Sequence, residues 1–99
     1  MLRELIAVFR ADGPRLEEDL ADALARGDAQ KLSRTAHTLK GVVGTFAAAR
    51  ALAAAQQVEL LAGQSDLAGA SAAAARLETE LGRLRNALGE LESVLEGGN

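Results

Sequence analysis

The strongest constraint on the fold is an unbroken helical pattern in the last third of the chain. Leucines and alanines recur there at alternating spacings of three and four, at Leu67, Ala70, Ala74, Leu77, Leu81, Leu84, Leu88, Leu91 and Leu95. Such a heptad seam buries one stripe of a long helix against neighbouring helices. In a chain of 99 residues we expect the seam to pack inside a helical bundle, beyond which its final turns can project.

Composition favours an all-α fold. Apolar residues make up 48% of the chain, but much of this is alanine and only 2% of residues are aromatic. The β-branched and aromatic residues that favour strands are scarce. A single proline leaves long helices possible, and the length suits one domain over residues 1–99 with one core.

Two short helices are expected before residue 26. The apolar face of residues 2–11 predicts an N-terminal helix, which Asp12 and Gly13 should end. Pro14 suits the first turn of the next helix, where its missing N–H costs little. The second helix is therefore expected over residues 14–25, with its acidic residues solvated.

Three further helices complete the prediction. Gly27 suits the position after a helix end and Asp28 suits an N-cap, so the third helix is expected over residues 29–44. A corner at Phe46 should turn the chain into a fourth helix over residues 48–62. The fifth, capped by Ser65 or Asp66, should end at residue 95, and residues 96–99 should form a frayed tail.

Charge and residue counts exclude several functions. The net charge is −3 with scattered cations, whereas nucleic-acid binding needs a basic face. No apolar stretch approaches the ~20 residues that cross a bilayer, so membrane insertion is not expected. Without cysteine there is no disulfide or thiolate metal site, which fits a reducing, cytoplasmic setting. A lone histidine also argues against a metal site.

That histidine, His37, heads the most informative segment. Lys40 follows three residues later, Gly41 and Gly44 follow at four and seven, and Ser33 precedes it by one turn. On a helix these residues share one stripe. An imidazole, a flexible cation and backbone without side chains are what a group needs to accept a phosphoryl group from a bulky protein donor.

Helical phase separates His37 from the core. Leu32, Ala36, Leu39 and Val43 fall on one face of the third helix, and His37 lies roughly 130° from the centre of that face. A solvated histidine without a task is the alternative. Against it, each helical glycine costs about 1 kcal/mol relative to alanine, which suggests that the space above Gly41 and Gly44 is needed.

The chain resembles the histidine-containing phosphotransfer (HPt) domains of bacterial phosphorelays over residues 5–88. The family's His-x-x-Lys-Gly pattern is present as His37-Thr38-Leu39-Lys40-Gly41. Residues 25–28 before the helix, residues 45–46 at the corner and Val58-Glu59 in the next helix also match. The chain departs from the family at Val42-Val43, where small polar residues are common, and at Ala47, where glycine is common.

The resemblance implies an antiparallel four-helix bundle with an additional short N-terminal helix. It implies that His37 is the phosphorylated residue, that Lys40 stabilises the phosphoryl group, and that Gly41 leaves room for the donor. The partners would be response-regulator receiver domains, which would bring the phospho-aspartate and Mg²⁺. The chain itself would have no cofactor and no autonomous kinase activity, and it could be part of a hybrid sensor kinase.

Three alternatives stay open at this point. The leucine seam of residues 67–95 could drive dimerisation of a purely structural bundle. The dimerisation helices of a sensor kinase also carry a phosphoacceptor histidine, but that class typically follows it with an acidic residue and a proline. The chain could also be an HPt-like fold without activity.

Overall fold

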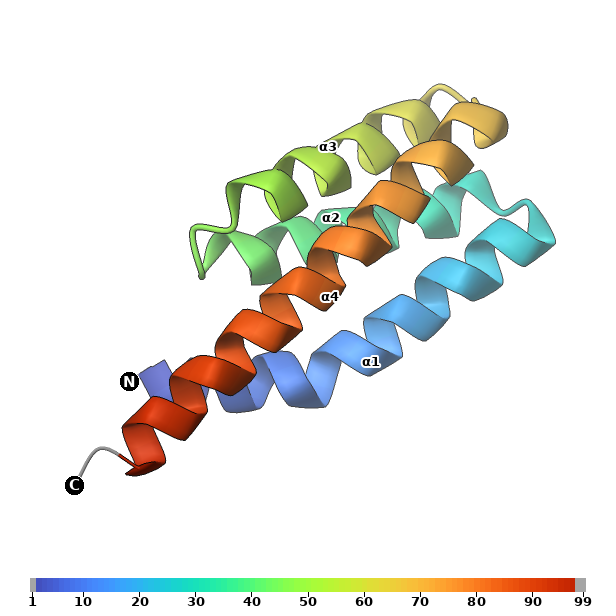
Figure 1. The fold of residues 1–99 in the computed structure, drawn as a ribbon. Coiled ribbons are helices and arrows are strands. Elements are labelled where there is room, and N and C mark those ends of the chain that lie inside the picture. The colour runs from blue at the N-terminus through green and yellow to red at the C-terminus, as the bar shows by residue number, and fades with distance from the viewer. Residues whose placement is uncertain (1, 98–99) are drawn as a thin grey trace.

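Four α-helices make up the structure, a computed structural model that describes residues 2–97. They are α1 (Leu2–Arg26), α2 (Ala29–Gly44), α3 (Ala49–Gly63) and α4 (Leu67–Gly97). Successive helices run antiparallel, and short connections at one end or the other of the bundle join them (Figure 1). The all-α bundle is therefore confirmed, and the described part of the chain contains no strand.

The separate N-terminal helix over residues 2–11 is wrong, because α1 continues through Pro14 to Arg26. A proline disfavours helical backbone at the residue before it mainly by clashing with that residue's Cβ and N–H. That residue is Gly13, which has no Cβ and lies buried beside the ring of Phe9. Pro14 still removes one backbone hydrogen bond, and α1 changes direction near its middle (Figure 1).

The other boundaries lie close to those expected. The third predicted helix matches α2, and the fourth is displaced by one residue to Ala49–Gly63. Asp28 caps α2 by accepting a hydrogen bond from the backbone N–H of Lys31 at 3.0 Å. Asp66, rather than Ser65, caps α4 through the N–H of Gly69 at 2.9 Å. The frayed tail predicted for residues 96–99 is wrong at residues 96–97, because α4 extends to Gly97. Residues 98–99 lie outside the described part of the chain.

A core of leucine and alanine holds the helices together. The four residues predicted for the inner face of α2, namely Leu32, Ala36, Leu39 and Val43, are all fully buried. Most of the heptad seam is also used inside the bundle, where Leu77, Leu81 and Leu88 are buried. The seam's last members, Leu91 and Leu95, are partly exposed because α4 outruns α2 and α3.

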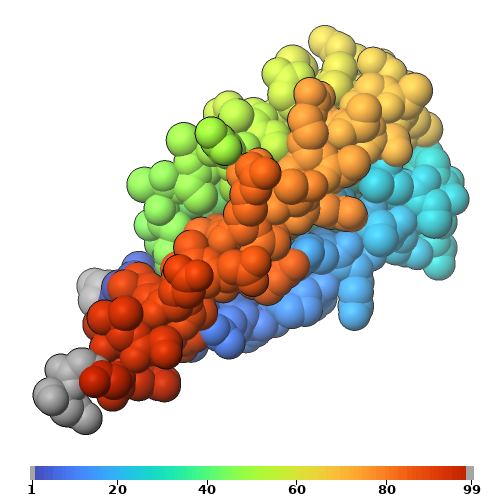
Figure 2. Space-filling model, viewed as in Figure 1, coloured from blue at the N-terminus to red at the C-terminus, as the bar shows by residue number. Residues whose placement is uncertain are grey.

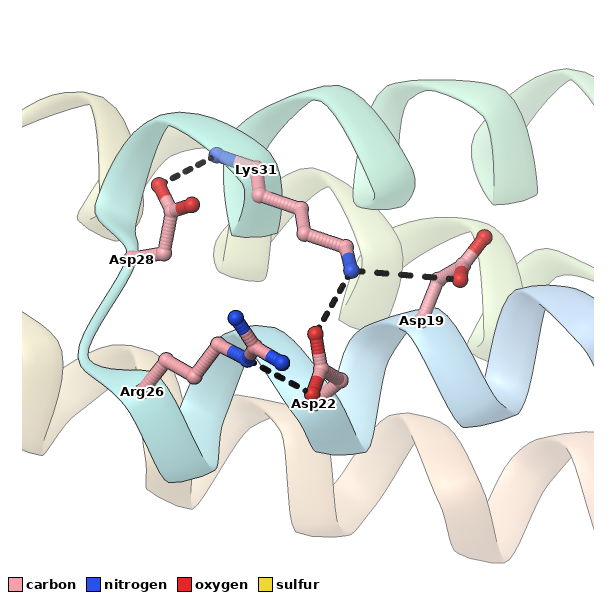
Figure 3. Close-up of polar contacts among 5 residues, drawn as sticks. All are labelled: Asp19, Asp22, Arg26, Asp28 and Lys31. Atoms are coloured by element: carbon pink, nitrogen blue, oxygen red, sulfur yellow. Dashed lines mark hydrogen bonds and ion pairs between the residues drawn. The ribbon is translucent and has the colours of Figure 1, made fainter.

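An ion-pair cluster fastens the end of α1 to the start of α2 (Figure 3). Lys31 Nζ lies 2.7 Å from Asp22 Oδ2 and 4.0 Å from Asp19 Oδ1, and Arg26 Nε lies 2.9 Å from Asp22 Oδ1. The hydrogen bonds from Lys31 and Arg26 hold the pKa of the Asp22 carboxyl below its ordinary value. Part of the acidic run on α1 is therefore structural rather than simply solvated.

The length of α4 sets the shape of the molecule. Its 31 residues span about 46 Å at 1.5 Å per residue, which accounts for most of the longest dimension of 51 Å. Its C-terminal end lies beside the start of α1, where Arg10 pairs with Glu92 and Arg3 donates to the Leu95 carbonyl at 3.0 Å. Among residues 2–97, no helix is both long and apolar enough to cross a membrane.

Ala47, at the corner between α2 and α3, has a left-handed backbone with φ of 53°. That conformation costs an L-residue about 1–2 kcal/mol, a cost that glycine avoids. Glycine loses more conformational entropy on folding, which offsets about 0.5–1 kcal/mol of that stabilisation. We therefore expect Ala47→Gly to raise the free energy of unfolding in urea by up to ~1 kcal/mol. The control Ala53→Gly, at an exposed helical position of α3, should lose about 1 kcal/mol. Equal losses at both positions would contradict the left-handed corner.

Candidate functional site

His37 stands on the outer side of α2. Its side chain is 67% exposed, whereas its neighbours Ala36 and Leu39 are fully buried. The core face of α2 thus fixes the helix and leaves the imidazole outside the core, as the helical phase predicted. The histidine is accessible to a large partner.

A single carboxylate joins the histidine to the lysine. Glu59 of α3 places Oε2 at 2.8 Å from His37 Nδ1 and Oε1 at 2.9 Å from Lys40 Nζ. The next residue toward the N-terminus, Val58, is fully buried in the core, so the packing of α3 aims Glu59 at α2. The two oxygens of Glu59 therefore bridge the residues that the sequence had placed on one stripe.

The contact to Glu59 determines which nitrogen of His37 is available. An ionised carboxylate only accepts hydrogen bonds, so Nδ1 must carry the proton that lies between them. In the neutral imidazole the other nitrogen, Nε2, then holds a free lone pair. Glu59 thus selects the tautomer in which Nε2 keeps its lone pair free, in the way that carboxylates orient histidines in other sites.

The electrostatics keep Glu59 ionised. The hydrogen bond from Lys40 lowers the pKa of the Glu59 carboxyl, burial opposes this, and the hydrogen bond with His37 lowers it further. Glu59 is 27% exposed and Lys40 is 30% exposed, so water screens the pair only partly. A charged carboxylate hydrogen-bonded to Nδ1 can also compensate positive charge that develops on the imidazole.

The other residues predicted for the site are Gly41, Gly44 and Ser33. They lie around His37, Lys40 and Glu59 without a side-chain hydrogen bond to them among residues 2–97. A Cβ built on Gly41 or on Gly44 meets nothing within 4 Å, so both positions open directly onto solvent. Ser33 is half-buried one turn before His37, and no hydrogen bond joins the two among residues 2–97. The glycines clear the surface beside His37, while Ser33 lies at the edge of the site.

Glu59 was not among the predicted site residues, although it was part of the family resemblance. It is the only acidic residue of α3, whose sequence is otherwise rich in alanine. An isolated acid on the helix that follows the histidine was therefore the available signal. Helical phase within α2 could not find it, because the contact depends on how two helices pack.

The surface hollows differ in how they lie relative to His37, Lys40 and Glu59. One, of about 380 Å³ between α3 and α4, includes Arg50 and Arg76 and shares no residue with the site. Another, of about 270 Å³, lies between α1 and α2 and includes Thr38 and Gly41, the latter one helical turn after His37. Among the residues that the structure describes, no three His, Asp or Glu side chains cluster closely enough to hold a metal ion.

The Glu59 carboxyl should titrate below its ordinary pKa in a ¹³C NMR titration. Because Lys40 is the largest cause, we expect Lys40→Met to raise that pKa more than His37→Gln does. A lowered folded-state pKa stabilises the fold at pH values above the unfolded-state pKa, and this contribution is lost as the pH falls through the folded-state value. Lys40→Met should therefore lose less stability on acidification. Identical Glu59 titrations in wild type and Lys40→Met would contradict the bridging arrangement.

Comparison with known proteins identifies the family of the chain. The family model described as Hpt domain matches residues 4–87. No curated protein and no solved structure matches the chain. The match covers most of the 99 residues and includes His37, Lys40 and Glu59. The chain therefore belongs to the Hpt domain family, whose members take part in histidine phosphotransfer within phosphorelays.

Proposed function

We propose that this chain carries a phosphoryl group on Nε2 of His37, taken reversibly from the phospho-aspartate of a response-regulator receiver domain. The observation that carries the proposal is the contact between the exposed imidazole of His37 and the partly buried carboxylate of Glu59. The Nδ1 atom lies 2.8 Å from Glu59 Oε2. That pairing leaves Nε2 as the only ring nitrogen free to attack. The domain is a carrier, without kinase activity of its own.

In the transfer step, Nε2 attacks phosphorus, the Nε2–P bond forms and the P–O bond to the aspartate breaks. The aspartate leaves as a carboxylate, and the Nδ1 proton stays between the ring and Glu59. The ring gains positive charge, which the Glu59 carboxylate offsets. Phosphoryl transfer has a loose transition state, so positioning and charge neutralisation supply most of the catalysis.

Lys40 has the complementary role at the phosphoryl oxygens. Its ammonium now pairs with Glu59 at 2.9 Å, and its flexible stem lets it turn toward a phosphoryl group one helical turn away. Mg²⁺ would belong to the receiver, which also supplies the aspartate. Whether the chain acts alone or within a hybrid sensor kinase does not change the chemistry at His37.

Transfer of radiolabel from a phosphorylated receiver tests the proposal. His37→Gln should accept no label, because the amide has no nucleophilic ring nitrogen, while circular dichroism should report an unchanged helix content for this exposed position. Lys40→Ala should slow transfer by about a hundredfold, the lower end of the range that loss of one charge-stabilising group produces. Label retained by His37→Gln would exclude His37 as the acceptor, and an unchanged rate in Lys40→Ala would remove the lysine from the site.

The proposed role of Gly41, which is to leave space for the receiver beside His37, gives a separate prediction. Gly41→Gln should stabilise α2 by up to ~1 kcal/mol, because the position is helical and unobstructed. It should nevertheless slow transfer from a receiver, since the new side chain occupies the space above the helix. The matched control is Gly82→Ala in α4, where a Cβ would make only ordinary contact with Arg85. A full transfer rate in a stabilised Gly41→Gln variant would show that the space is not used.

A further inference from the structure

A shallow trough runs along the outer side of the bundle between α3 and α4. It consists of two adjoining hollows of about 380 and 300 Å³, which share Arg50 and Glu80 and therefore form one surface. On α4 the trough extends from Arg76 to Ala87, about 18 Å at 1.5 Å per residue. No residue that lines it comes from α2, so the trough is separate from His37.

The trough is positively charged, although the chain as a whole has a net charge of −3. Arg50, Arg76 and Arg83 line it, and Glu80 is the one carboxylate among its lining residues. Arg83 pairs with Glu80 at 2.8 Å, whereas Arg50 and Arg76 form no ion pair among residues 2–97. Such a surface complements an acidic partner.

The floor of the trough is apolar and low. It includes Ala53 and Ala54 of α3 and Ala87 of α4. Because alanine side chains are short, the floor lies below the longer arginine side chains and has room for larger apolar groups, which gain contacts by filling it. The trough therefore suits a helix that carries larger apolar residues beside a carboxylate.

The α4 extension (residues 89–97) has these properties. Its end projects beyond the start of α3, as Figure 2 shows by the red end of α4 and the green start of α3. Leu91 is 36% exposed and Val94 is 67% exposed, and Glu90 beside them forms no ion pair among residues 2–97. The extension spans about 14 Å, so its length fits within the trough.

The extension is held in place within its own copy. Glu92 pairs with Arg10, and Arg3 donates a hydrogen bond to the Leu95 carbonyl at 3.0 Å. At 100° per residue, Glu92 lies about 160° around the helix from both Glu90 and Val94. The contacts with α1 therefore order the extension and leave its other face open, which lowers the entropic cost of docking.

The trough and the open face of the extension lie on the same side of α4. Alternating spacings of four and three residues define this outer stripe, which comprises Arg76, Glu80, Arg83, Ala87, Glu90 and Val94. It is distinct from the leucine seam, whose members Leu77, Leu81 and Leu88 are buried. The stripe is mainly basic along the trough and carries a carboxylate and a valine along the extension. Two copies of α4 placed antiparallel therefore bring the extension of each against the trough of the other.

We propose that the chain forms a two-fold symmetric dimer in which the α4 extension of each copy docks in the α3–α4 trough of the other. Leu91 and Val94 cover the alanine floor, and Glu90 lies among the arginines that have no carboxylate partner in their own copy. The two contacts are identical, so the dimer is closed. This inference does not depend on the proposed function, and it leaves His37 of both copies exposed.

Sedimentation equilibrium over a range of protein concentrations measures the dimer directly. Val94→Glu places a charge in the apolar contact and should raise the dimer dissociation constant by roughly tenfold or more, because the charge becomes buried on docking. The matched control is Val8→Glu, at a valine of α1 that is 51% exposed and lies outside the trough. It should leave the dissociation constant unchanged, and both variants should keep the helix content of wild type.

Charge reversal tests which two surfaces meet. Glu90→Arg alone and the double variant Arg50→Glu/Arg76→Glu should each raise the dissociation constant by roughly tenfold or more, because like charges then meet in both contacts. An equimolar mixture of the two should form a heterodimer within about threefold of wild-type affinity, since symmetry pairs opposite charges in both contacts. Glu78→Arg, at an exposed carboxylate of α4 outside the trough, is the control and should dimerise normally.

The outcomes are distinct. Wild type that stays a monomer up to about 1 mM would overturn the proposal, because a second copy is then not what occupies the trough. A dimer that Val94→Glu and both charge reversals leave intact would use another surface. Failure of the mixture to associate would show that the extension does not meet the trough. Label transfer from a phosphorylated receiver is a separate measurement: its absence in wild type would defeat the proposed function alone, and its loss only in Val94→Glu would contradict the separation of the trough from His37.

Discussion

The Glu59 carboxylate connects α3 to α2 beside His37, the proposed phosphoacceptor. Its reach to both His37 and Lys40, at 2.8 and 2.9 Å, requires the two helices to pack closely. Buried alanines make that possible: Ala36 on α2 and Ala51 and Ala55 on α3 belong to the same core. Because interiors are close-packed, a larger side chain at these positions would separate the helices and withdraw the carboxylate. The alanine-rich composition thus serves the site as well as the fold.

The arrangement assigns different work to groups that lie within a few ångströms. In the proposed mechanism, Glu59 fixes the tautomer of the imidazole and offsets its charge, and His37 supplies Nε2. Lys40 is the cation that would exchange its pairing with the carboxylate for one with the phosphoryl group. Such a site would need a precise surface but no enclosed cavity, because in the proposed transfer the partner supplies the phosphoryl group and covers the site. This explains why the histidine is mostly exposed while the residues that hold it are not.

Much of the fold could be read from the sequence, because periodicity and capping are local. The residues 32, 36, 39 and 43 gave the buried face of α2, and Asp28 gave its start. Pro14 was misleading, since its effect on the helix depends on the preceding residue, Gly13, which has no Cβ to clash with the proline ring. Glu59 was missed as a site residue for a related reason. Its role depends on the register between two helices, which no pattern within a single helix contains.

The position of the phosphoryl group on the ring tests the central claim most directly. Histidine labelled with ¹⁵N would be incorporated, the protein phosphorylated, and the ³¹P–¹⁵N coupling measured by NMR. The account predicts that phosphorus couples to Nε2 of His37 and that Nδ1 keeps its proton, because Glu59 occupies the Nδ1 side. Phosphorus bonded to Nδ1 would contradict it, since that nitrogen could not then hold its contact with Glu59.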